Sequence, residues 1–338
     1  MRGAGESGSL QIGFLGRIPP ALGGAGLELQ MERTRAALER RGHEVFHVEA
    51  GGKDDRFDLL HAFGSEPAVW HHLRHWSRNP APLIVTSVLV VSPGRRERML
   101  RLSTRVPGVM GGGRMRAEVL RRANAVVAGT EYERNLATGS FGADPQRTVV
   151  IGNGAERVEP GALPEGVPDS GYALLLGSVS RRKRQASTME ALAAAAPVVI
   201  AGAFDGDAAQ ERAWEAAVRK AGATWLGHVG DAAALAALQH RAGALVHLSE
   251  AEVESLAVLE CLAQGTPAVL SDIPSHRALA RRYPGFIELA GDTGSVPAAF
   301  ERMRAKRLSE PAQVPSWEDV AAELEALYRR VLRHPRGR

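Results

Sequence analysis

The chain has 338 residues and a formal net charge of +4, and its hydrophobic and charged fractions of 44% and 24% are those of a globular protein. No apolar run approaches the ~18 residues that a membrane-spanning helix needs, and the first stretch, MRGAGESGSLQ, lacks the apolar segment of a secretory signal. A single cysteine, Cys261, excludes an intrachain disulfide framework and a cysteine-cluster metal site. We therefore expect a cytoplasmic protein.

Arginine supplies almost all of the positive charge, and basic clusters lie at 94–105, 111–122 and 180–184. They fit two interpretations: solvated helix faces, or a surface for an anionic partner such as a phosphate substrate, anionic lipid or nucleic acid. Aromatic residues make up only 5% of the chain, and no stacking motif accompanies the basic stretches. Nucleic acid is therefore the least supported partner, and we expect none.

The first half of the chain alternates short apolar runs with helical patterns. A buried strand at 10–16 enters a Gly/Pro-rich loop, a helical pattern follows from Leu27, and Gly42 fits its C-cap before a second strand. Further apolar runs, several of them separated by helical segments, lie at 58–64, 81–91, 124–130 and 147–155. This alternation predicts a parallel, helix-covered sheet, which we assign to a first domain at residues 1–160.

The second half repeats the same organisation. The stretch ERVEPGALPEGVPDSG is rich in proline, glycine and acid, so we expect an interdomain linker there. Strand and helix patterns then alternate again, which predicts a second α/β domain at residues 161–314. The last segment, 315–338, contains a long amphipathic helix.

Three loops of these domains are candidates for chemistry. In the first, Gly23, Gly24 and Gly26 precede a helix, where free amides and the helix dipole favour an anion. A plain strand–helix turn is the alternative, because glycine-rich turns of this kind are common and the dinucleotide fingerprint Gly-x-Gly-x-x-Gly is absent.

The second loop follows the apolar run that ends at Leu176. Gly177 and Ser178 lead into four successive basic residues at 181–184. An exposed helix start is one interpretation, but four cations at the positive end of a helix dipole are unfavourable without a counter-charge. This tension favours a phosphate-bearing ligand.

The third loop contains EVESLAVLE, with an acid at each end of an apolar stretch, Glu252 and Glu260. Ser255 is a plausible N-cap, and the amides of Ser255 and Leu256 would be uncapped donors for an anion. Glu260 and Gln264 share a helix face, so they form either a solvated stripe or, for Glu260, a carboxylate that binds ligand hydroxyls. Periodicity alone leaves both interpretations open.

These segments, in this order, resemble the retaining family-four glycosyltransferases, glycosyl transferases group 1. The resemblance rests on the acid–seven residues–acid spacing followed by LAQGTPAVLSDIPSH, and on GGAGLELQMERTRAALERRGHEV, FDLLHAFG and LLLGSVSRRKR. It implies the GT-B fold: two Rossmann-like α/β domains with parallel sheets facing a central cleft, and a C-terminal helix that crosses back to the N-terminal domain.

The resemblance also implies a function. It points to a retaining, metal-independent glycosyltransferase of hexosyltransferase type, which moves a sugar from a nucleotide-diphospho-sugar, UDP- or GDP-linked, to a glycan, glycolipid or small metabolite. No cofactor is implied. Among the catalytic residues, Glu252 would attend the transferred sugar, while Arg182 and Lys183 would stabilise the leaving diphosphate.

The same resemblance assigns donor-binding positions. Glu260 would bind the ribose hydroxyls, and the amides of Ser255 and Leu256 would meet the pyrophosphate together with the glycine-rich loop. The full donor-binding set is Gly24, Gly26, Gly177, Ser178, Ser255, Leu256 and Glu260.

The sequence departs from the family pattern at Ser178 and at Ser87. Many relatives carry arginine where this chain has Ser178, so the cationic role is moved to Arg182; many carry histidine where it has Ser87. Ser87 and His61 are candidate acceptor-side or cleft residues, although a structural role for His61 is equally compatible with the sequence. A non-catalytic nucleotide-sugar-binding or scaffold protein is the main alternative, and a sugar-nucleotide epimerase a weaker one. The basic stretches also allow peripheral contact with an anionic membrane.

Overall fold

The computed structural model describes residues 8–16, 26–48, 57–75, 81–92, 94–104, 111–306 and 310–334. The chain divides into two compact units. The N-terminal unit comprises Met1–Gly154 together with Pro315–Arg338, and the C-terminal unit comprises Ala155–Val314. No described helix combines the length and the apolar character that crossing a bilayer requires.

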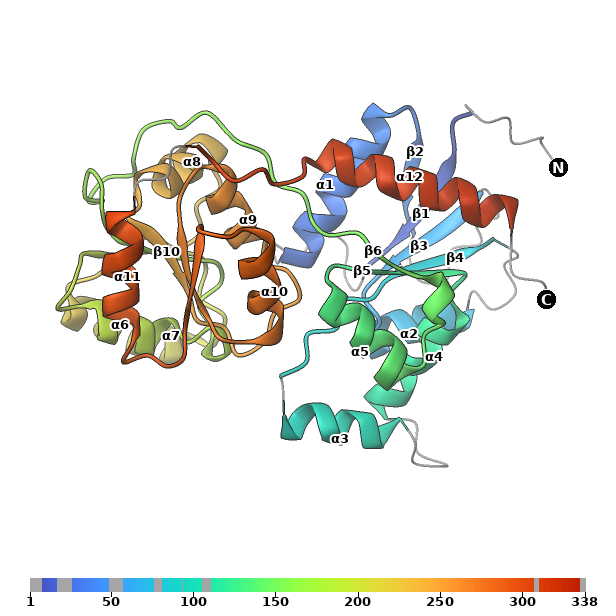
Figure 1. The fold of residues 1–338 in the computed structure, drawn as a ribbon, viewed down its shortest axis with the longest axis horizontal. Coiled ribbons are helices and arrows are strands. Elements are labelled where there is room, and N and C mark those ends of the chain that lie inside the picture. Colours follow the sequence, from blue (N-terminus) through green and yellow to red (C-terminus); the bar gives the residue numbers. More distant parts are fainter. Residues whose placement is uncertain are drawn as a thin grey trace. The chain divides into compact units, whose positions relative to one another are not determined.

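A six-stranded sheet forms the centre of the N-terminal unit, with every neighbouring pair parallel (Figure 1). Several of its strands are short and mostly apolar, such as LIVT and AVVA, because helices cover both faces of a parallel sheet. The sheet order is β2-β1-β3-β4-β5-β6. The strands are β1 Gln11–Leu15, β2 Glu44–His47, β3 Leu59–Phe63, β4 Leu83–Thr86, β5 Ala125–Ala128 and β6 Thr148–Val150.

The helices of this unit begin and end where local chemistry allows. In the best-defined case, Thr130 caps the first turn of its helix by accepting from the Glu133 amide, and Gly142 ends it in the left-handed conformation. The helices are α1 Gly26–Arg40, α2 Pro67–His75, α3 Arg95–Ser103, α4 Gly112–Arg122 and α5 Glu131–Phe141, with the short 3-10 helix η2 at Pro145–Arg147.

The last helix, α12 (Trp317–Arg333), belongs to the N-terminal unit and packs against α1 (Figure 1). A capping box between Ser316 and Asp319 begins the helix. Its apolar face is buried, and Arg41 beyond the end of α1 donates to both Glu318 and Glu325. The predicted return of the C-terminal helix to the N-terminal domain is confirmed.

The C-terminal unit contains a second parallel six-stranded sheet, in the order β12-β11-β10-β7-β8-β9. Its strands are β7 Ala173–Leu176, β8 Val198–Ala201, β9 Thr224–Trp225, β10 Ala244–His247, β11 Ala268–Ser271 and β12 Ile287–Ala290. Its helices are η3 Arg181–Lys183, α6 Gln185–Leu192, α7 Ala208–Ala221, α8 Ala232–Arg241, α9 Leu256–Ala263, α10 Pro274–Arg282 and α11 Val296–Ala305. Two Rossmann-like units with parallel sheets confirm the predicted fold class.

The stretch 156–171, predicted as a linker, belongs to the C-terminal unit. Gly161 donates from its amide to the carbonyl of Ala233, and Gln264 donates from its side chain to the carbonyl of Val158. These bonds hold the stretch along the helices that carry the candidate site.

Candidate functional site

Two of the predicted loops of the C-terminal unit meet because they follow neighbouring strands. The strands β7 and β10 are paired in the sheet, so the loops that leave their carboxyl ends lie side by side. The amide of Glu250 donates to the carbonyl of Arg182 at 2.9 Å, and Arg184 lies 3.5 Å from the Glu250 carboxylate. The basic loop at 177–184 and the acidic loop at 249–255 therefore form one continuous edge, which we call the loop platform.

The basic loop at 177–184 requires its glycine. Gly177 has φ +110°, a conformation that side-chain-bearing residues rarely adopt, and a Cβ built there would collide with the Lys183 ammonium group. Gln185 closes the loop by donating to the carbonyl of Ser178 at 2.8 Å and accepting from the Ser180 amide at 3.1 Å. The Ser178 side chain is exposed at this loop.

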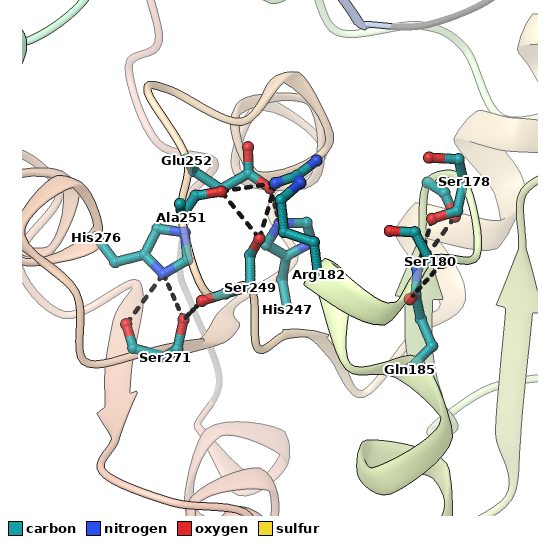
Figure 2. A network of polar contacts seen from close by, with 11 residues as sticks. Ser178, Ser180, Arg182, Gln185, His247, Ser249, Ala251, Glu252, Ser271 and His276 are labelled. Atoms are coloured by element: carbon teal, nitrogen blue, oxygen red, sulfur yellow. Dashed lines mark hydrogen bonds and ion pairs between the residues drawn. The ribbon is translucent and has the colours of Figure 1, made fainter. Parts of the chain in front are cut away.

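Glu252 is the most strongly held acid of the loop platform (Figure 2). Its Oε1 accepts from Arg182 Nη1 at 2.8 Å and lies 3.3 Å from Nε2 of His247, and its side chain is only 12% exposed. Burial would raise the pKa of this carboxyl, but the hydrogen bond and charge of His247, with the charges of Arg182 and Lys183, lower the pKa well below its usual range. Glu252 is therefore a fixed negative charge and not a proton donor at neutral pH.

The two cations differ in how they are held. Arg182 Nη1 also donates to Ser249 Oγ at 3.0 Å and to the Ala251 carbonyl at 2.6 Å (Figure 2), yet 40% of its side chain is exposed. One nitrogen of the guanidinium thus binds the loop while the rest of the fork remains at the surface. Burial lowers the pKa of Lys183, with the Glu252 charge acting in the opposite direction.

The start of α9 supplies two backbone donors. Ser255 is the N-cap, but its side chain makes no capping bond. Across the described residues, no acceptor takes a hydrogen bond from the amides of Ser255 or Leu256. Uncapped amides at the positive end of a helix dipole favour an anion, as predicted from the sequence.

Glu260 lies one to two turns further along α9 and is half-buried, with Gln239 Nε2 3.4 Å from its Oε2. The alternative of a solvated Glu260/Gln264 stripe does not fit the structure, because Gln264 is only 3% exposed and donates to the Val158 carbonyl at 2.9 Å. Glu254, a further acid of the same loop, is buried, and its Oε1 lies 3.3 Å from Nη1 of Arg282 on α10.

The candidates in the N-terminal unit have different surroundings. Gly24 lies outside the described residues; Gly26 is the first residue of α1, and a Cβ there would meet nothing within 4 Å. His61 is fully buried, with Nδ1 2.6 Å from the Tyr328 hydroxyl and Nε2 2.8 Å from Thr86 Oγ1. Burial lowers the pKa of His61 to about 3. Both ring nitrogens are thus engaged, which favours the structural alternative and leaves no ring nitrogen for an acceptor.

Ser87 is also fully buried and serves an internal carboxylate. Its hydroxyl donates to Glu133 Oε1 at 2.8 Å, and Glu133 also accepts from the amides of Leu89 and Gly129, both at 2.6 Å. Burial raises the pKa of Glu133, and these hydrogen bonds oppose the rise. The cluster holds Val88 at φ +45°, a strained conformation for a β-branched residue. In this conformation the Ser87 side chain is not available to contact a sugar donor or an acceptor substrate.

Comparisons with known proteins agree with this geometry. Residues 165–302, which contain the loop platform and α9, match the family model described as Glycosyl transferases group 1. The C-terminal unit therefore contains the domain of this family. The chain is accordingly a glycosyltransferase, which transfers a sugar from a nucleotide sugar. A search of curated protein sequences found no significant match.

Solved structures similar to this glycosyltransferase cover nearly its whole length. A sucrose-phosphate synthase from Thermosynechococcus elongatus has 17% identity and a TM-score of 0.72 over 96% of this chain and 99% of that chain. AviGT4, a glycosyltransferase involved in avilamycin A biosynthesis, has 17% identity and a TM-score of 0.64, with coverages of 96% and 98%. A glycosyltransferase from Rickettsia africae has 12% identity and a TM-score of 0.65, with coverages of 96% and 99%. At these identities the likeness establishes the GT-B fold.

The glycosyltransferase contains one Asp-x-Asp triplet, Asp205-Gly206-Asp207, in the loop after β8, although the expectation of a metal-free enzyme took this motif to be absent. The Asp207 carboxylate accepts from the amides of Ala209 and Gln210 and so caps α7. Among the described residues, no group of three or more His, Cys, Asp or Glu side chains is arranged to hold a metal ion.

Sequence reasoning missed the polar side chains behind Glu252: His247, Ser249, Ser271 and His276 (Figure 2). A signal existed for His247, because it ends an apolar strand directly before the acidic loop. No local signal pointed to His276, whose place depends on the neighbouring strand β11.

Proposed function

We propose that this glycosyltransferase is a retaining, metal-independent enzyme of hexosyltransferase type, acting on a UDP- or GDP-linked sugar. The observation that carries the proposal is the loop platform, which lies at one edge of the sheet. It combines the ionised Glu252 carboxylate, held through Oε1, with the cations Arg182 and Lys183 and the uncapped start of α9. This combination suits a nucleotide-sugar donor, because in the transition state the sugar gains positive charge and the diphosphate gains negative charge.

The proposed donor contacts follow from the chemistry of each group. The amides of Ser255 and Leu256 would bind the diphosphate, and the open loop at Gly177 and Ser178 would admit it beside Lys183. Arg182 can keep Nη1 on Glu252 while the exposed part of its fork meets a phosphate oxygen. Glu260 would accept hydrogen bonds from the ribose hydroxyls, which offsets the cost of its partial burial.

The proposed reaction takes place on one face of the sugar. The bond from the anomeric carbon to the diphosphate oxygen breaks, and the acceptor hydroxyl oxygen forms its bond on the same face. The departing phosphate oxygen takes the hydroxyl proton, so configuration is retained. Glu252 stabilises the positive charge on the sugar, and Arg182 with Lys183 stabilises the charge on the diphosphate. We assign acceptor binding to the N-terminal unit by family resemblance.

A two-step experiment tests this proposal. Thermal unfolding with UDP, GDP, ADP and their glucose and mannose conjugates should identify one donor by its stabilisation. NMR of the product formed from that donor should then show the donor's anomeric configuration. Glu252→Ala should abolish turnover, and Glu260→Ala should raise the donor KM. An inverted product, or full activity of Glu252→Ala, contradicts the proposal; loss of activity on addition of EDTA contradicts metal independence.

Peripheral contact with an anionic membrane forms a second part of the proposal, together with a cytoplasmic location. Helix α3 carries Met99 and Leu102, 61% and 63% exposed, beside the exposed Arg98. Exposed apolar and basic residues on one helix fit an interfacial surface. Binding to phosphatidylglycerol vesicles should be strong at low salt and weaken in Met99→Ser/Leu102→Ser, whereas Leu29→Ser/Phe46→Ser should bind normally. Absence of binding at low salt contradicts this part.

A non-catalytic nucleotide-sugar-binding protein is the second candidate, favoured by Ser178 in place of an arginine and by the burial of Ser87. Stabilisation by a nucleotide sugar without product or donor hydrolysis would support it.

A further inference from the structure

His247 ends β10 and is buried directly beneath the loop that carries Glu252. Its Nε2 lies 3.3 Å from Glu252 Oε1. Because the pKa of Glu252 is held well below its usual range, the carboxylate is ionised and can only accept. Nε2 of His247 must therefore carry the hydrogen and act as the donor in this hydrogen bond.

The two donors to Glu252 use the same oxygen. Arg182 Nη1 and His247 Nε2 both reach Oε1, at 2.8 and 3.3 Å. The other oxygen, Oε2, makes no hydrogen bond with the part of the chain that the structure describes. A carboxylate with one oxygen held from two sides has little rotational freedom, so the direction of its second oxygen is set.

The ring of His247 is itself held in place (Figure 2). It packs edge-on against the buried ring of His276, with centroids 5.8 Å apart and an interplanar angle of 64°. Nδ1 of His276 lies 2.9 Å from the Ser271 carbonyl, and the Ser271 hydroxyl donates to the Ser249 carbonyl at 2.6 Å. Burial, with the charge of His247, lowers the pKa of His276 to about 4, so this neighbour is neutral.

We propose that His247 is a positioning residue for sugar transfer: together with Arg182 it holds Oε1 of Glu252, so that Oε2 is presented to the transferred sugar. The inference rests on the proposed role of Glu252. His247 itself touches neither the donor nor the acceptor.

Two substitutions separate this role from a merely structural one. His247→Leu keeps an apolar body of similar size without the donor, and His247→Gln restores an N–H on a flexible side chain. With UDP-glucose, GDP-mannose and ADP-glucose as probes and released nucleoside diphosphate as readout, His247→Leu should lower kcat about 10–100-fold, because small misplacements of a reacting group have effects of this size. The donor KM should change less than about 3-fold, and His247→Gln should regain much of the lost kcat.

Tyr172→Phe is the matched control. It removes a buried hydrogen bond, from the Tyr172 hydroxyl to the Leu238 carbonyl at 2.7 Å, at the opposite end of the same sheet. It should leave kcat unchanged. If His247→Leu has no larger effect on kcat than Tyr172→Phe, the inference is overturned.

A double-mutant cycle gives a readout independent of turnover. The urea midpoints of wild type, His247→Leu, Glu252→Gln and the double variant should show non-additivity, because each single change removes the same contact. Additive shifts overturn the inference whether or not any of the three sugars is turned over. Full activity of Glu252→Ala would instead refute the proposed function, so the two failures are distinguishable.

Discussion

Tyr328 on α12 and His61 on β3 allow a quantitative test of what holds the C-terminal helix to the N-terminal unit. Both side chains are fully buried, and the Tyr328 hydroxyl lies 2.6 Å from His61 Nδ1. In Tyr328→Phe the ring and its packing remain, so no cavity forms and only the hydrogen bond is lost. His61 cannot turn to compensate, because Nε2 is already bound to Thr86 at 2.8 Å.

The expected cost follows from the unpaired nitrogen. A buried polar group left without its partner costs about 1–3 kcal/mol. For amide hydrogens that exchange only when α12 and β3 unfold locally, that cost corresponds to a roughly 5–150-fold loss of protection, at 1.4 kcal/mol per factor of ten. Native-state hydrogen exchange by mass spectrometry should show the loss in peptides from α12 and β3, with peptides of the C-terminal unit unchanged.

Tyr283→Phe is the matched control for this measurement. The Tyr283 hydroxyl is also buried, but it has no hydrogen-bond partner among the described residues. Its removal should leave protection unchanged or slightly increased, since an unpaired buried hydroxyl is unfavourable. If Tyr328→Phe changes protection no more than Tyr283→Phe, the His61–Tyr328 bond does not hold α12 and the reasoning fails.

Three further predictions concern glycine, strain and pH. Gly177→Ala should lower the unfolding free energy by more than about 1 kcal/mol and raise the donor KM, because φ is +110° and the added methyl displaces Lys183; unchanged urea unfolding and donor titration would contradict this. Arg184→Gly should raise stability by about 0.5–1 kcal/mol, because Arg184 has φ +54°; a fall in the urea midpoint would mean that the 3.5 Å contact with Glu250 matters more. Burial lowers the pKa of His61 to about 3 and of His276 to about 4, so between roughly pH 6.5 and pH 4 the unfolded chain binds protons that the folded chain does not. The free energy of unfolding, measured by urea titration, should therefore fall by about 2 kcal/mol per histidine from pH 7 to pH 5, and a flat profile would refute the assignment.

The sequence allowed prediction of whatever depends on local pattern. Apolar runs such as ALLL and ALVH predicted the buried strands, and the loops at 177–184 and 249–255 were recognised because charged residues follow those strands directly. That the two loops touch depends on β7 and β10 being neighbours, which the sheet order shows and no local pattern encodes.

What could not be predicted depends on partners far apart in the chain. The roles of Glu254 and Gln264 are set by Arg282 and by the Val158 carbonyl, and no periodicity encodes either contact. Glu133 stands where a capping box would place an acid at a helix start, yet its carboxylate accepts from Ser87 and Leu89 of another strand's loop. Spacing identified the residue types; the sheet order decided which groups they meet.

The return of α12 to the N-terminal unit has a consequence for biosynthesis. The C-terminal unit is one uninterrupted segment, Ala155–Val314, whereas the N-terminal unit needs Pro315–Arg338 to complete it. His61 leaves the ribosome 267 residues before its partner Tyr328. During translation, the C-terminal unit is thus the first to have all of its residues. The N-terminal unit, although its synthesis begins earlier, lacks α12 until the end of the chain is released.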